Sequence, residues 1–159
     1  MTVDIAAHEA LQAEVEHLRQ RNIELERIQE FTRVLLENLS DGVVACDATG
    51  ELVLFNRAAR TWHGVDVQNL PPEAWASAYD LYAADGVTPL PTEEIPLLRA
   101  FGGEHVQEAG MAIVANGQAP RQILANAVPL IDTDGQKIGA VAIMHDITVD
   151  TYAESARQL

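Results

Sequence analysis

The chain opens with a long segment that contains no glycine or proline. Residues 2–38 hold neither residue type, and Glu, Gln, Arg and Leu are frequent among them. Proline and glycine interrupt helices most strongly, whereas Leu, Arg, Gln and Glu favour them. The segment is therefore predicted to form one long helix, because no internal stop signal divides it.

Apolar side chains recur along this helix with the seven-residue period of a coiled coil. When Val15 is taken as position a of the heptad, Asn22 occupies the next a position. An asparagine buried there fixes the register and the number of strands, although it costs stability. The predicted dimer interface consists of six residues: Leu11, Val15, Leu18, Asn22, Leu25 and Ile28. Ile28 follows Leu25 by three residues where the heptad requires four, a step that overwinds a coiled coil locally.

Charged residues flank the seam. In a parallel dimer each g residue comes close to the e residue five positions later on the partner helix. These pairs are Glu14 with Arg19 and Arg21 with Glu26, and both are opposite in charge. The helix is therefore predicted to form a homodimeric coiled coil. The alternative is an amphipathic helix that packs on its own domain.

The apolar pattern changes from a helical period to a period of two after Gly42. Residues 43–47 and 51–55 are predicted to form two strands joined by a turn. Asn56 is the expected N-cap of a short helix that Gly64 ends. Proline and Asp-Gly pairs between residues 65 and 96 predict turns and loops. A further helix is predicted over residues 92–100, with Thr92 as its cap.

Three longer strands are predicted in the second half of the chain, at residues 106–115, 121–131 and 137–147. Asn116-Gly117 and Asp134-Gly135 lie between them and favour tight hairpin turns. The third strand contains an apolar run, residues 138–144, without polar alternation, so it is expected at the centre of the sheet. A helix is expected to follow this strand.

Several strings in this arrangement resemble the PAS domain family. The string Asp41-Gly-Val-Val-Ala-Cys-Asp-Ala-Thr-Gly-Glu-Leu-Val-Leu-Phe-Asn-Arg-Ala-Ala is similar to its opening strands and first helix. Residues 127–135 are similar to the end of its fourth strand and the following turn. Gly139 to Ile143, followed by Asp146-Ile-Thr, is similar to its last strand and exit signature. The resemblance covers about residues 36–150.

The resemblance implies an α+β fold. Its five-stranded antiparallel sheet has the order 2-1-5-4-3, and short helices cover one face and enclose a cavity. The implied organisation is a dimeric coiled-coil helix at residues 1–35, a PAS domain at 36–150 and the start of an exit signalling helix at 151–159.

The resemblance also implies a function in bacterial signal transduction. The domain would be a sensor or relay of a larger signalling protein, for example a sensor histidine kinase of a two-component system. It would pass a conformational signal to an output domain in the same full-length chain. Asp146 and Thr148 would transmit it by tying the strand end to neighbouring backbone N–H groups. The alternative is a purely structural dimerisation or protein-interaction module without a ligand.

A small molecule of unknown identity could occupy the implied cavity. Asn126 would be its polar anchor within an apolar strand. The alternative is an interior that side chains fill completely. The residues expected to line the cavity are Trp75, Tyr79, Tyr82, Leu97, Phe101, Ile113, Leu124, Asn126 and Ile143.

Neither flavin nor haem is expected as a cofactor, and no metal is expected. The Asn-Cys-Arg-Phe-Leu-Gln type of string found in light-sensing flavin relatives is missing, and Cys46, which lies in the first strand, is expected to be a buried small hydrophobe. Haem-binding relatives carry a histidine on the helix that corresponds to residues 92–100, and this chain has none there. His63 and His105 are expected at the surface or in loops, and His145 on the outer side of the last strand.

Charge and the motif content argue against other classes of function. The formal net charge is −14 at pH 7, so binding to nucleic acid or to an anionic membrane surface is not expected. The sequence contains no serine nucleophile elbow, no His-x-x-x-His pair and no phosphate-binding loop, so no enzymatic activity is expected. The single cysteine suits the reducing cytoplasm, which is the expected location.

Overall fold

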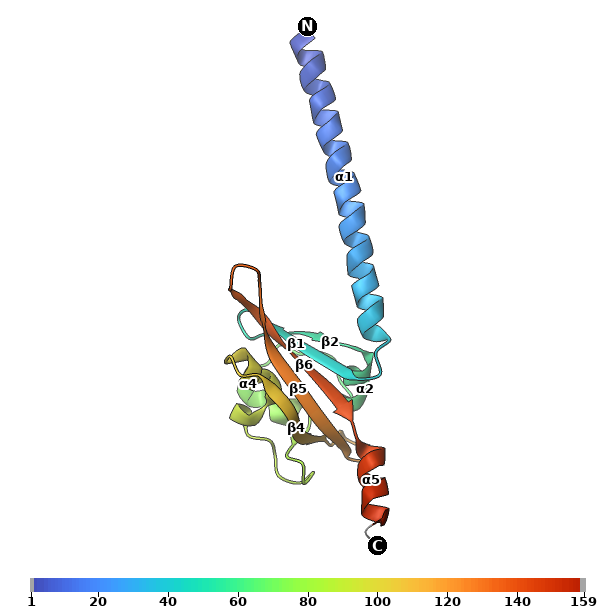
Figure 1. Ribbon diagram of the computed structural model, residues 1–159, viewed down its shortest axis with the longest axis vertical. Coiled ribbons are helices and arrows are strands. Elements are labelled where there is room, and N and C mark those ends of the chain that lie inside the picture. Colours follow the sequence, from blue (N-terminus) through green and yellow to red (C-terminus); the bar gives the residue numbers. More distant parts are fainter. Residues whose placement is uncertain (1, 158–159) are drawn as a thin grey trace. The chain divides into compact units, whose positions relative to one another are not determined.

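The computed structural model describes residues 2–157 of the chain. Residue 1 of the predicted first segment and residues 158–159 of the predicted exit segment lie outside the described residues. The chain divides into two units, residues 1–38 and 39–159. The first unit is the helix α1, Thr2–Glu37, which runs for 36 residues (Figure 1). The predicted long helix is confirmed.

The second unit is built on one antiparallel sheet (Figure 1). Its strands are β1 Gly42–Asp47, β2 Leu52–Phe55, β3 Leu81–Tyr82, β4 Val106–Ile113, β5 Arg121–Ile131 and β6 Lys137–Asp146. The order is β2-β1-β6-β5-β4-β3, so β6 lies between β1 and β5 as the apolar run predicted. Each strand of the predicted order is present, and the predicted fold class is confirmed.

The sheet has six strands where five were predicted. The additional strand β3 has only two residues, and Leu81 and Tyr82 pair with Ile113 and Ala112 of β4. A strand of two residues is too short to show an alternating apolar pattern, so the sequence does not predict β3. The free edge of β4 supplies the hydrogen-bonding partner that makes this short segment a strand.

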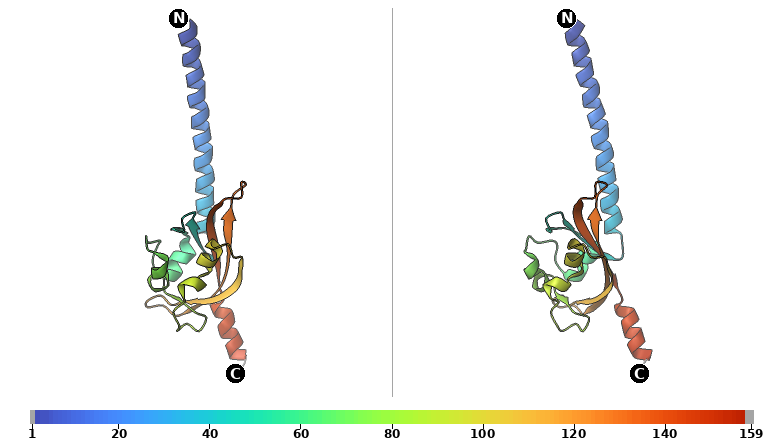
Figure 2. Two further views of the ribbon diagram at one scale, coloured as in Figure 1. Left: turned by 90° about the vertical axis from the view of Figure 1, so that its left-hand side faces the viewer. Right: turned by 60° about the vertical axis from the view of Figure 1, so that its left-hand side comes forward.

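Short helices between β2 and β4 cover one face of the sheet (Figure 2). They are α2 Arg57–His63, the 3₁₀ turn Pro72–Ala74, α3 Trp75–Ala78, the 3₁₀ turn Thr92–Glu94 and α4 Pro96–Phe101. The predicted cap of α2 is present, since the Asn56 side chain accepts a hydrogen bond from the Ala59 amide. Gly64 ends this helix in the left-handed conformation with φ 76°.

The helix predicted over residues 92–100 starts later than its sequence suggests. A 3₁₀ turn covers Thr92–Glu94, Ile95 is extended with φ −63° and ψ 120°, and α4 begins at Pro96. Proline lacks a backbone N–H and disfavours helical geometry in the residue before it, so Pro96 can begin this helix but not continue one. Thr92 is therefore not the cap of α4.

The helix α5, Thr148–Arg157, follows β6 after a single residue. Its first residue, Thr148, comes three positions before the start of the predicted exit segment. Among the described residues, no helix combines the length and the apolar character needed to cross a bilayer.

Candidate functional site

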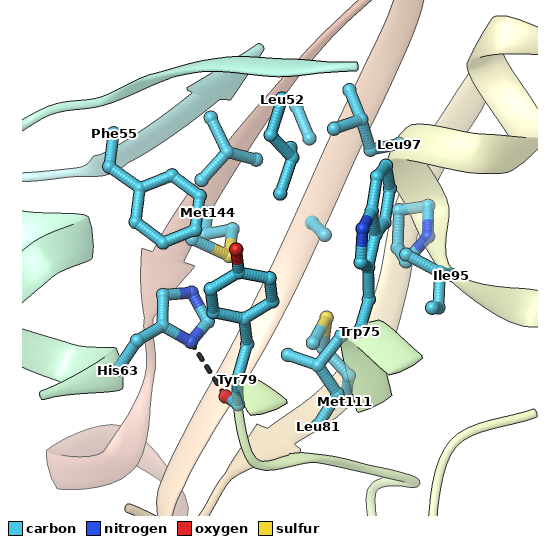
Figure 3. A pocket seen from close by; sticks show the side chains of 14 residues that line it. Leu52, Phe55, His63, Trp75, Tyr79, Leu81, Ile95, Leu97, Met111 and Met144 are labelled. Atoms are coloured by element: carbon cyan, nitrogen blue, oxygen red, sulfur yellow. Dashed lines mark hydrogen bonds between the residues drawn. The ribbon is translucent and has the colours of Figure 1, made fainter. Parts of the chain in front are cut away.

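A cavity of about 40 Å³ lies between the short helices and the inner face of the sheet (Figure 3). Ala125 of β5 and Ala142 of β6 form part of its floor and are 0% and 2% exposed. Small side chains at these central positions leave space that larger residues would fill. One water molecule needs roughly 10–15 Å³ by the same measure, so the cavity is large enough for a molecule of a few heavy atoms.

Aromatic side chains from the end of β2 and from the region of α3 form another wall of the cavity. The ring centroids of Phe55 and Tyr79 are 5.2 Å apart, and Trp75 also lines the space. The indole Nε1 of Trp75 donates a hydrogen bond to the Leu70 carbonyl at 3.1 Å. The Tyr79 hydroxyl donates to the Gln68 carbonyl at 3.2 Å and accepts from the Gln68 amide at 2.9 Å. The polar atoms of both rings are thus satisfied by the protein.

His63 is a residue of this cavity that the sequence argument placed wrongly. It is 4% exposed, rather than lying at the surface or in a loop. Its Nδ1 lies 2.8 Å from the backbone oxygen of Tyr79 and donates a proton to it, since a carbonyl can only accept (Figure 3). Burial lowers the pKa of His63 to about 4, although the hydrogen bond opposes this shift. The ring is therefore neutral at pH 7.

A helical period could have revealed His63. Ala59, Trp62 and His63 are the buried residues of α2 and follow the i, i+3, i+4 spacing of one helix face. Ala59 and Trp62 are apolar and mark the inward face of the helix, and His63 shares this face.

Three of the nine predicted cavity residues line the cavity: Trp75, Tyr79 and Leu97. Three others, Leu124, Asn126 and Ile143, lie on the opposite face of the sheet. The inward residues of β5 are Ile123, Ala125 and Ala127, so the predicted face is displaced by one residue. Because strand side chains alternate, a shift of one position moves the whole set to the other side.

Asn126 has a structural role on that outer face. Its Oδ1 accepts a hydrogen bond from the Glu108 amide at 3.0 Å. Glu108 has φ 48° and lies in the irregular segment of the β4–β5 ladder between Val106 and Ala109. The asparagine satisfies a backbone N–H that the irregular ladder leaves unpaired. It is therefore not the polar anchor of the cavity.

The remaining three predicted residues also lie outside the cavity lining. Ile113 is 1% exposed in β4, and Tyr82 is half-buried in the edge strand β3. Phe101 ends α4, and the Lys137 ammonium lies 3.8 Å from the centre of its ring. These side chains contribute to packing rather than to the cavity wall.

Cys46, His105 and His145 are not among the residues that line the cavity. Cys46 is 2% exposed in β1, and burial raises the pKa of its thiol, which favours the protonated form. His105 is exposed, and the exposed His145 pairs with Asp41 at 2.9 Å. In the part of the chain that the structure describes, no three His, Cys, Asp or Glu side chains gather in a way that could hold a metal ion.

Asp146 and Thr148 join the end of β6 to the beginning of α5. The Thr148 amide donates to Asp146 Oδ1 at 2.9 Å, and the Thr148 hydroxyl donates to the same oxygen. The Gln122 amide of β5 donates to the Thr148 hydroxyl oxygen at 2.9 Å, and the Ile147 amide donates to the Gln122 carbonyl at 2.8 Å. Both predicted residues therefore contribute to one junction between two strands and a helix.

Arg121 belongs to this junction although the sequence argument did not include it. Its guanidinium lies 3.0 Å from Asp146 Oδ2. Burial raises the pKa of Asp146, but hydrogen bonds from Thr148 and the charge of Arg121 outweigh it, so the pKa lies below its ordinary value. The carboxylate therefore stays charged at neutral pH.

The predicted dimer seam of α1 is exposed in the single chain. The side chains of Leu11, Leu18 and Ile28 are 60%, 51% and 62% exposed. Val15, Asn22 and Leu25 are exposed as well. Large apolar side chains, at heptad spacing from Leu11 to Leu25, are thus exposed in the single chain.

Comparison with known families identifies the class of protein. The model of the PAS fold matches residues 36–150, so the chain belongs to the PAS fold family. Members of this family are generally sensory modules rather than catalysts. No curated protein sequence shows a significant match to the chain.

Solved structures share the fold at low sequence identity. The PAS domain of an HTR-like protein from Haloarcula marismortui is 16% identical with a TM-score of 0.50, and the match covers 81% of this chain and 99% of that one. The Escherichia coli DhaR(N)–DhaL complex is 19% identical with a TM-score of 0.53, and the match covers 80% of this chain and 39% of that one. The PAS domain of Bordetella pertussis BvgS is 20% identical with a TM-score of 0.48, and the match covers 86% of this chain and 96% of that one.

Proposed function

We propose that the chain is the sensor or signal-relay domain of a larger signalling protein, such as a bacterial sensor histidine kinase. The main support is the junction at Asp146 and Thr148, where a central strand of the sheet continues directly into α5. A shift of β6 relative to β5 would strain the hydrogen bonds of this junction and turn the first turn of α5. An output domain in the full-length chain would receive this movement through α5.

The proposed relay acts as a homodimer through α1. The heptad seam from Leu11 to Ile28 supplies the apolar contact, and the pairs of charges at g and e favour a parallel arrangement. In a parallel dimer the two copies present the same faces to each other, so a rotation of each helix changes the packing of both. The net charge of −14 and the single cysteine support a cytoplasmic location without nucleic-acid or membrane contact.

The ligand proposed for the cavity is a small, uncharged and largely apolar molecule. The lining consists of aliphatic, aromatic and thioether side chains together with the neutral ring of His63. A charged ligand would lose its hydration without gaining an ionic partner from the lining residues, which makes its binding unfavourable. A space of about 40 Å³ excludes haem and flavin unless the helices move apart. The domain itself is proposed to be non-catalytic.

Native mass spectrometry of the full chain tests the sensor function. A small molecule that stays bound in the native spectrum and is absent from the denatured one would support it. The variant Ala142→Leu, which adds volume to the floor of the cavity, should abolish this added mass. The matched variant Ala45→Leu, on the half-buried outer side of β1, should retain it.

The small volume of the cavity also favours a second candidate function. A structural dimerisation module would have a filled interior and no ligand, and about 40 Å³ is close to that condition. This second function is supported if repeated preparations carry no added mass and small apolar probes such as xenon leave the NMR signals of the cavity residues unchanged. Those results would contradict the sensor function.

A further inference from the structure

The guanidinium of Arg121 lies between the helical layer and the junction with α5. Its Cζ is 5.9 Å from the centre of the Trp62 ring, and one terminal nitrogen contacts Asp146 at 3.0 Å. The Nε atom is buried and has no hydrogen-bond partner among the described residues. A buried N–H without an acceptor is unfavourable, whereas the negative face of an indole attracts the cation. The position of Arg121 therefore depends on Trp62 as well as on Asp146.

Trp62 is held tightly inside the second unit. It belongs to α2 and is 7% exposed. A Cβ atom at Gly42 would lie 2.8 Å from Cζ3 of Trp62 and 3.0 Å from Cε of Met144. The indole therefore packs against the start of β1, close to a methionine that lines the cavity. Its neighbour in the sequence, His63, lines the cavity too.

The two oxygens of one carboxylate connect Arg121 to α5. Asp146 Oδ2 contacts Arg121, while Oδ1 accepts hydrogen bonds from the amide and the hydroxyl of Thr148, the first residue of the helix. A movement of Arg121 would therefore act on the hydrogen bonds that fix the first turn of α5. These contacts form a continuous series from Trp62, the neighbour of the cavity residue His63, to the exit helix.

The loop before β5 supports the same connection. Gln118 Nε2 donates to the Thr61 carbonyl at 3.4 Å. The backbone around Gly64 also lies near this loop, because a Cβ there would be 3.9 Å from Cβ of Ala115. The C-terminal end of α2 thus contacts the segment that leads into Arg121.

We propose that Trp62 and Arg121 form a latch that couples the position of α2, and with it the occupancy of the cavity, to the first turn of α5. The physiological meaning of the latch rests on the proposed relay function, but the coupling itself is a property of the second unit. When α2 moves, the indole of Trp62 withdraws from the guanidinium of Arg121, and the ion pair between Arg121 and Asp146 weakens. The hydrogen bonds from Thr148 to Asp146 then open more often. Trp62 and Arg121 are thus positioning residues for α5.

Amide hydrogen exchange at Thr148 tests the latch in the full chain. The variant Trp62→Leu should raise the exchange rate of the Thr148 amide about two- to fivefold, as expected for the loss of one partly exposed cation–π contact. The Gly135 amide, which donates to the Asp132 carbonyl at 3.1 Å in the β5–β6 turn, serves as an internal reference and should not change. The pKa of the Asp146 carboxyl, followed by NMR, should rise in the same variant.

The Arg121→Gln background distinguishes the latch from ordinary packing. In this background Trp62→Leu should have no further effect on Thr148 exchange, because the contact through which it acts is already absent. Arg99→Gln is the matched control, since it removes an arginine of similar exposure from an ion pair with Glu104, and it should leave Thr148 unchanged. Equal effects of Trp62→Leu with and without Arg121 would overturn the proposal, and so would no effect at Thr148.

A milder variant keeps the test valid if Trp62→Leu does not fold. Trp62→Phe retains an aromatic face with a weaker attraction for cations, so a smaller rise in Thr148 exchange is expected, again only when Arg121 is present. A rise that persists in Arg121→Gln would contradict the latch. The two tests are independent of each other. If the hydrogen-exchange results contradict the latch, the native mass spectrometry test of the ligand is unaffected. If no ligand is found, the coupling between Trp62 and Thr148 can still be measured.

Discussion

The Nδ1 of His63 lies 2.8 Å from the backbone oxygen of Tyr79, so the ring donates to the end of α3 from the end of α2. This bond connects two helical segments that flank the cavity. It also fixes the tautomer, because the proton must be on Nδ1 to reach a carbonyl. A protonated ring would carry a charge in a buried site, which is why the pKa of His63 falls to about 4.

Acid should therefore weaken the fold in a defined pH range. The pKa of His63 is about 4 in the folded chain, against an ordinary value of 6.5, so the unfolded chain binds the additional proton between these values. The contribution of His63 to the free energy of unfolding is fully present above pH 6.5 and decreases as the pH is lowered toward 4. The loss between pH 7 and pH 5 should be roughly 2 kcal/mol, measurable by urea unfolding.

The variant His63→Phe is the control for this pH dependence. It keeps a ring in the cavity wall but cannot be protonated, so its stability should change less between pH 7 and pH 5 than that of the wild-type chain. The hydrogen bond to Tyr79 is lost at both pH values and cancels in the comparison. An identical pH dependence in both chains would show that other groups are responsible.

Two isoleucines on neighbouring strands test which face of the sheet is the inner one. Ile123 of β5 is 1% exposed and Ile143 of β6 is 44% exposed. Ile123→Ala should cost about 2–5 kcal/mol, because it leaves a hole in a packed interior. Ile143→Ala should cost less than about 1 kcal/mol, since water can reach the site. Similar losses in denaturant unfolding would contradict the observed orientation of these strands.

These residues also show how far the sequence could predict the structure. The turns at Asn116-Gly117 and Asp134-Gly135 predicted the hairpins of the long strands, and the apolar run of β6 predicted its central place. The strand order itself came from the resemblance to the PAS family. The orientation of each strand was harder, because β5 carries apolar residues on both faces, among them Ile123 inside and Leu124 outside. An alternating pattern reveals the inner face only when the outer face is polar. The predicted cavity residues Leu124, Asn126 and Ile143 were wrong for this reason.

Contacts between distant segments were beyond the reach of local patterns. Arg121 and Asp146 are 25 positions apart, and Trp62 lies on a helix far from both in the sequence. The exit signature Asp146-Ile-Thr indicated the junction, but no local pattern pairs it with Arg121. The short strand β3 was missed in the same way, since only its partner β4 defines it.

The asparagine at position a of the α1 heptad gives a prediction for the proposed dimer. Asn22→Leu should raise the melting temperature of the dimer, because an apolar side chain replaces a polar one in the expected seam. The same change should loosen the choice of oligomer, so larger species should appear in light scattering. An unchanged melting temperature together with a uniform dimer would contradict a buried Asn22.

Charges placed in the seam should separate the proposed dimer. The double variant Leu18→Glu with Leu25→Glu places four carboxylates in the interface of a dimer, where like charges repel and lose hydration, so light scattering should report a monomer. Ala13→Glu with Gln20→Glu adds the same charge at two f positions of the heptad, which face away from the seam, and should leave a dimer. If the first variant remains dimeric at working concentration, the interface lies outside the α1 seam.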